Sequence, residues 1–159
     1  MTTSDLLPGA PSFRRPVLDS MYRHARACFP DECCGFVVGD GADAQVVCGA
    51  NVRKNRRHDA PGPSPRATEH AYLLDDSALL EFAYTFLSDR PPTVIFHSHP
   101  IVGAYFSLED RRAALHSGWE IDYLVIDVQS AIIPEARLYR RRRNTDCFVE
   151  IAHYPGRDW

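Results

Sequence analysis

The chain has 159 residues, 45% of them hydrophobic and 25% charged, so it is long enough to bury its own core and has an ordinary soluble composition. Its formal net charge of −3 gives no general electrostatic reason to expect a nucleic acid partner. No run approaches the roughly 18 apolar residues that a membrane span needs, and the N-terminus lacks the apolar segment of a signal peptide, so no membrane partner is expected.

The first half of the chain predicts a helix and a hairpin. Apolar residues recur at helical spacing over residues 17–29, and Pro30 ends the pattern. The stretch CGFVVGD (34–40) predicts a short strand, and AQVVCGANV (44–52) is its expected hairpin partner. Residues 53–68 form a polar loop broken by prolines. Its basic residues either contact an acidic partner or are simply solvated: Arg53, Lys54, Arg56 and Arg57.

The second half alternates strands with helices. We expect strands at EHAYLL (69–74) and TVIFHSH (93–99), and helices from Asp75 or Asp76 to about Ser88 and over residues 107–116. Three more strands are expected at IDYLVIDV (121–128), ARLYRRR (136–142) and CFVEIAHY (147–154). This order indicates an α/β or α+β fold rather than a sandwich. We expect a single domain over residues 17–154, with a flexible lead-in at 1–16 and a short tail at 155–159.

The stretch HSHPIVGAYFSLED (97–110) suggests a metal site. Residues two apart in a strand point to the same face, so His97 and His99 present two imidazoles side by side. Asp110, near the start of the next helix, is well placed to be a third ligand, and two histidines with a carboxylate form a plausible zinc set. Ser107 and Asp110 also have the spacing of a helix capping box, which by itself makes Asp110 structural. The two interpretations are compatible, because a cap can fix the helix that delivers a ligand.

A second motif lies upstream, at PDECCGFVVG (30–39), where Glu32 stands between the first helix and the first strand. Taken together, P-x-E-x-C-G-x-x-x-G and H-S-H-P-x6-S-x2-D resemble the JAMM (MPN+; Mov34/MPN/PAD-1) zinc metalloprotease family, in its compact bacterial stand-alone form. The resemblance implies a mixed, partly curled sheet flanked by helices, akin to cytidine deaminases. A deaminase itself is excluded, because the chain has no H-x-E and no P-C-x-x-C.

The same resemblance implies a catalytic site. His97, His99 and Asp110 are expected to hold one zinc ion, Glu32 to act as general base, and Ser107 to donate a hydrogen bond to the oxyanion. The implied reaction is hydrolysis of a peptide or isopeptide bond, at the Gly-Gly end of a ubiquitin-like or sulfur-carrier protein. A homodimer is left open.

Two other functions remain as alternatives. One is a non-catalytic MPN-type scaffold, which usually has degraded ligands, whereas here none is missing. The other is a peptidase of peptidoglycan fragments, for which an adjoining cell-wall or hydrolase domain is expected.

The five cysteines cannot all pair within one chain, and a reduced, cytoplasmic setting is expected. Cys33 and Cys34 flank the expected base. They are either thiols whose oxidation blocks the site or inert buried thiols.

Overall fold

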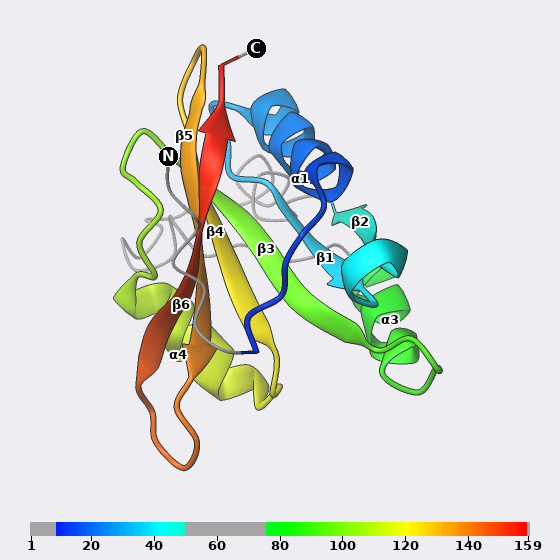
Figure 1. The fold of residues 1–159 in the computed structure, drawn as a ribbon. Helices are drawn as coiled ribbons and strands as arrows, with labels where there is room; N and C mark the ends of the chain where they lie inside the picture. The colour runs from blue at the N-terminus through cyan, green and yellow to red at the C-terminus, as the bar shows by residue number, and fades with distance from the viewer. Residues whose placement is uncertain (1–8, 50–75, 159) are drawn as a thin grey trace, which may run out of the picture.

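The computed structural model describes residues 9–49 and 76–158 (Figure 1). The strand expected at residues 69–74 and the basic loop at 53–68 lie outside these residues. None of the described helices is long and apolar enough to cross a membrane.

The described residues form one six-stranded sheet, with strand order β2-β1-β3-β4-β5-β6. All neighbouring strands are antiparallel except β3 and β4, which are parallel and joined through a helix. The strands are β1 (Cys34–Val38), β2 (Gln45–Gly49), β3 (Pro92–Pro100), β4 (Asp122–Val128), β5 (Ile133–Arg141) and β6 (Phe148–Arg157). The expected mixed sheet is therefore confirmed.

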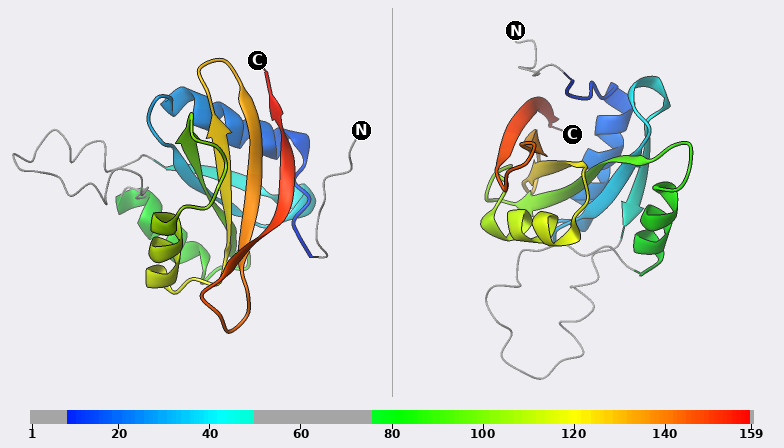
Figure 2. Two further views of the ribbon diagram at one scale, coloured as in Figure 1. Left: turned by 90° about the vertical axis from the view of Figure 1, so that its left-hand side faces the viewer. Right: turned by 90° about the horizontal axis from the view of Figure 1, so that it is seen from below.

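Helices cover both faces of the sheet, as Figure 2 shows. The α-helices among the described residues are α1 (Arg15–Cys28), α3 (Asp76–Thr85) and α4 (Leu108–Ser117), and a 3-10 turn, η1 (Gly41–Asp43), joins β1 to β2. Strand alternation divides the core: Phe96 and Leu124 face α1, whereas Ile95 and Val125 face the side of α3 and α4. The histidines of β3 share the face of Ile95, so the sheet directs them toward α4.

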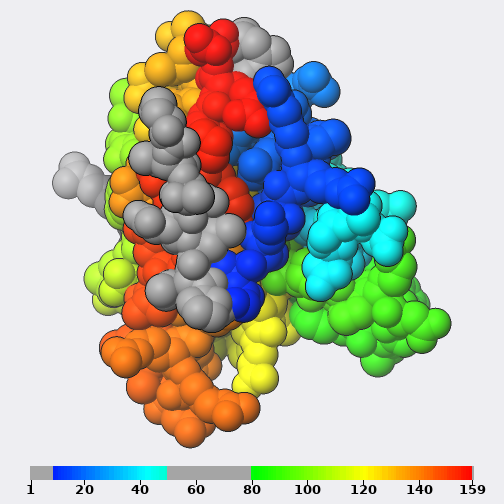
Figure 3. Space-filling model, in the orientation of Figure 1, coloured from blue at the N-terminus to red at the C-terminus, as the bar shows by residue number. Residues whose placement is uncertain are grey.

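Residues before Val17 and after Tyr154 are packed or paired in the structure. Helix α1 begins at Arg15 because Pro16 is compatible with the first helical turn. Upstream, Phe13 is buried against Tyr154, with ring centroids 5.4 Å apart, and this segment lies along β6 in Figure 3. Strand β6 runs on through Pro155, which is tolerated because β6 lies at the edge of the sheet formed by the described strands.

Candidate metal centre

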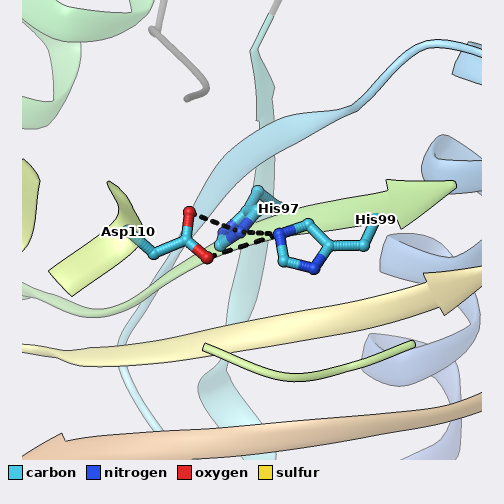
Figure 4. A group of neighbouring side chains, drawn as sticks. All are labelled: His97, His99 and Asp110. Atoms are coloured by element: carbon cyan, nitrogen blue, oxygen red, sulfur yellow. Dashed lines mark hydrogen bonds and ion pairs between the residues drawn. The ribbon is translucent and has the colours of Figure 1, made fainter. Parts of the chain in front are cut away.

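Strand β3 carries His97 and His99 into the interior. Its apolar residues are buried on both faces of the sheet, and the histidines are almost fully buried as well, at 0% and 2% exposed. Their rings lie with centroids 4.8 Å apart, and both point toward the start of α4 (Figure 4). The expectation that the two imidazoles lie side by side is confirmed.

Helix α4 brings Asp110 to the histidines. Its N-terminus is a capping box: Ser107 Oγ accepts from the Asp110 N–H at 3.0 Å, and Asp110 Oδ2 accepts from the Ser107 N–H at 2.9 Å. At the other end, Gly118 closes the helix in the left-handed conformation, with φ 70°. The capping interpretation is therefore confirmed, and the same cap fixes the Asp110 carboxylate beside the two histidines.

The side chains of His97, His99 and Asp110 bring their possible metal-binding atoms together. The Nε2 atoms of His97 and His99 are 3.1 Å apart, and Asp110 lies 3.2 Å from the first through Oδ1 and 3.3 Å from the second through Oδ2. Tetrahedral zinc, with ligands at about 2.0–2.2 Å, sets its ligand atoms about 3.3–3.5 Å apart. With one ligand atom from each residue, the three atoms all lie within 4.8 Å of one another, and two imidazoles with a carboxylate are ligands that zinc accepts. These residues therefore fit a zinc ion.

Electrostatics keep these groups in the protonation states that a metal needs. Burial lowers the pKa of His97 below its ordinary value, although Asp110 opposes that effect. Burial alone would raise the pKa of Asp110, but attraction and hydrogen bonding from His97 and His99 outweigh it and hold that pKa well below its usual range. Burial thus favours the neutral form of His97, and the two histidines favour the ionised form of Asp110.

The loop after β3 orients His99. Its Nδ1 donates to the Gly103 carbonyl at 3.2 Å, which leaves the lone pair of Nε2 directed at the cluster. The ring of Tyr105 lies 5.1 Å from the His99 ring, centroid to centroid. The sequence motif gives no sign of the Gly103 contact, because a backbone carbonyl has no residue signature.

Glu32 lies where the chain enters β1 beside the histidines. Cys34 pairs with His97, the Ser98 N–H donates to the Cys33 carbonyl at 3.2 Å, and the Cys33 N–H donates to Ser98 Oγ at 2.8 Å. Strand β1 and its recorded pairing begin at Cys34, two residues after Glu32. Glu32 is 9% exposed, so its carboxyl is largely withdrawn from solvent.

Cys33 and Cys34 are both fully buried. Burial raises the pKa of the Cys33 thiol well above its ordinary value, so this thiol stays protonated and poorly nucleophilic. The structure favours the interpretation of Cys33 as an inert core thiol.

Known proteins resemble this chain in sequence and in fold. CysO-cysteine peptidases of Mycobacterium tuberculosis and Mycobacterium bovis are 29% identical to it over 129 residues, which cover 80% of each chain. Solution structures of proteins from Desulfitobacterium hafniense and Salinibacter ruber share the fold, with TM-scores of 0.58 and 0.57, at 21% and 19% identity over 86% of each chain. The sequence model of the family described as prokaryotic homologs of the JAB domain matches residues 14–142. The chain therefore belongs to the prokaryotic JAB-domain family, as its two motifs indicate.

Proposed function

We propose that this protein is a zinc-dependent peptidase that releases a small group from the C-terminus of a sulfur-carrier protein. The observation that carries the proposal is the buried cluster of His97, His99 and Asp110, whose donor atoms all lie within 4.8 Å of one another. Membership of the JAB-domain family and the similarity to CysO-cysteine peptidases support it.

The metal would be held by His97, His99 and Asp110, with a further position left for water. Zinc bound in this way lowers the pKa of its water to about 7, which supplies hydroxide at neutral pH. Because all three donors are buried and come from one strand and one capped helix, they need little rearrangement to bind an ion.

Glu32 would serve as general base and then as general acid. A carboxylate with little solvent can take a proton from the attacking water and deliver it to the leaving amine. Glu32 lies two residues before β1, the strand that pairs with β3.

Ser107 would stabilise the oxyanion. Its Oγ accepts one hydrogen bond from the Asp110 N–H, which occupies a lone pair and leaves the hydroxyl proton able to donate. The capping box therefore does not compete with this role, and it holds Ser107 Oγ 3.0 Å from the Asp110 backbone nitrogen.

The loop between β3 and α4 would contact the substrate. It borders the cluster directly and, together with the first residue of α4, exposes four apolar side chains. These are Ile101, Val102, Tyr105 and Leu108, all more than half exposed. An extended Gly-Gly tail, which has no side chains, would pass close to the donors while the adjoining residues contact this apolar rim.

The test uses a sulfur-carrier protein whose Gly-Gly terminus is joined to the amino group of cysteine. Mass spectrometry should detect hydrolysis by the wild type and a fall of about 100-fold or more in the Glu32→Gln variant, which should still bind zinc. Glu120→Gln, which changes an exposed glutamate, is the matched control and should be unaffected. Wild-type turnover in Glu32→Gln would refute the assigned base. Zinc binding without hydrolysis in the wild type would favour a scaffold or another peptide substrate.

A further inference from the structure

The loop between β3 and α4, residues 101–107, touches the metal centre at three places. The Gly103 carbonyl accepts from His99 Nδ1 at 3.2 Å, and the ring of Tyr105 lies 5.1 Å from the His99 ring, centroid to centroid. Ser107 caps α4, the helix that carries the third candidate ligand. No residue of this loop belongs to a helix or a strand, so the positions of these three groups depend on what holds the loop from its other side.

The loop residues between these contacts pack into the core. Ala104 and Phe106 are 3% and 4% exposed, whereas Tyr105, between them, is 51% exposed. Tyr139 of β5 contacts both buried residues. Its hydroxyl donates to the Ala104 carbonyl at 2.8 Å, and its ring stacks on the Phe106 ring, with centroids 5.3 Å apart and an angle of 17° between the planes. Tyr139 therefore holds the loop at the residues that alternate with those touching the metal centre.

The hydroxyl of Tyr139 is suited to this contact, and a neighbouring tyrosine provides a comparison. Tyr139 is buried, and burial raises its pKa to about 12, so the hydroxyl keeps its proton at neutral pH and can donate to a carbonyl. Tyr123 pairs with Tyr139 in the register of β4 and β5, and its ring lies 5.4 Å from that of Phe106. The Tyr123 hydroxyl, however, has no hydrogen-bond partner among the described residues. The two tyrosines share their packing against Phe106 and differ in the hydroxyl contact with the loop.

We infer that Tyr139 is a positioning residue of the metal centre, because its hydroxyl fixes the Ala104 carbonyl and with it the adjoining Gly103 carbonyl. The Gly103 carbonyl then keeps His99 protonated at Nδ1, which leaves a lone pair on Nε2 for the ion. The inference rests on the proposed function only through the assignment of His99 as a metal ligand. Tyr139 acts through the loop and touches no reacting group.

The first test is zinc affinity, measured by competition with a chelator. Tyr139→Phe removes the hydroxyl but keeps the ring that packs on Phe106, and it should weaken zinc binding about 10-fold. Tyr123→Phe is the matched control, because it removes a buried hydroxyl from the same aromatic cluster without removing a contact to the loop. Its zinc affinity should equal that of the wild type. Unchanged affinity in Tyr139→Phe, or equal losses in the two variants, would overturn the inference.

The second test reads the imidazole directly and does not depend on zinc or on activity. In ¹⁵N spectra of the metal-free protein at mildly alkaline pH, His99 should carry a proton on Nδ1 in the wild type and in Tyr123→Phe, and Tyr139→Phe should lose that preference. A wild-type His99 without a proton on Nδ1 would overturn the inference even if Tyr139→Phe fails to fold. A wild type that has this proton but binds no zinc would instead contradict the proposed function, and the spectra of the two variants would then decide the inference by themselves.

Discussion

Ser107 is both a helix cap and the proposed oxyanion donor, and substitution can separate the two roles. Replacing an N-cap serine with alanine costs about 1 kcal/mol of stability, whereas glycine at this position costs only a few tenths. The extended backbone of Ser107, with φ −68° and ψ 165°, is open to glycine. Both variants lack the hydroxyl, so both lose the proposed donor but differ in the stability of α4.

The two effects differ greatly in size. For a domain of this length, about 1 kcal/mol lowers Tm by about 2–4 °C and leaves the protein folded at room temperature. Loss of an oxyanion donor lowers kcat about 100- to 1000-fold, equal to about 2.7–4 kcal/mol of transition-state stabilisation. A cap defect alone therefore cannot account for such a loss of rate.

The assay follows single-turnover hydrolysis of the Gly-Gly-cysteine adduct, with zinc content measured on the same samples. We predict that Ser107→Gly and Ser107→Ala lose activity equally and keep zinc, that only Ser107→Ala loses stability appreciably, and that Ser107→Thr keeps most of the activity. A zinc-loaded Ser107→Gly variant that turns over close to the wild-type rate would show that the hydroxyl acts only as a cap.

Three further predictions concern pH, thiols and packing. Burial lowers the pKa of His97 below 6.5, so the unfolded chain binds a proton on this imidazole at a higher pH than the folded chain does. The free energy of unfolding should therefore be highest above pH 6.5 and fall as the pH is lowered. If the Tm of the metal-free protein rose as the pH was lowered from 7 to 5, this prediction would be wrong. Iodoacetamide should label the exposed Cys48 and Cys147 in the native protein but reach the buried Cys33 only after unfolding, as peptide mapping would reveal. Gly35→Ala should destabilise the fold by about 1–3 kcal/mol in urea titrations, because its Cβ would collide with a core phenylalanine ring; an unchanged midpoint would refute that packing.

The cluster of His97, His99 and Asp110 can be predicted from sequence patterns, because the strand period and the helix cap of nearby residues determine where these side chains lie. His97 and His99 lie together because a strand repeats every two residues, and Asp110 lies at the helix start because Ser107 caps it. The resemblance to a known family adds Glu32, which no local pattern joins to the histidines. In the structure that link is the pairing of β1 with β3, a contact between segments about 60 residues apart in the chain.

The supporting contacts could not be predicted from the sequence in the same way. The Gly103 carbonyl that accepts from His99 Nδ1 has no residue signature. Pro155 likewise obscures the end of β6 in the sequence, since only the order of the described strands shows that β6 lies at the edge of their sheet.

The central claim is that His97, His99 and Asp110 form a zinc site, and elemental analysis of the purified protein tests it most directly. The wild type should contain about one zinc per chain, as a site with three protein ligands requires. Asp110→Ala should contain little, whereas Ser107→Gly, which lacks the cap hydroxyl but keeps all three donors, should match the wild type. A wild type that takes up no zinc when it is supplied, or an Asp110→Ala variant that keeps its full complement, would contradict the claim.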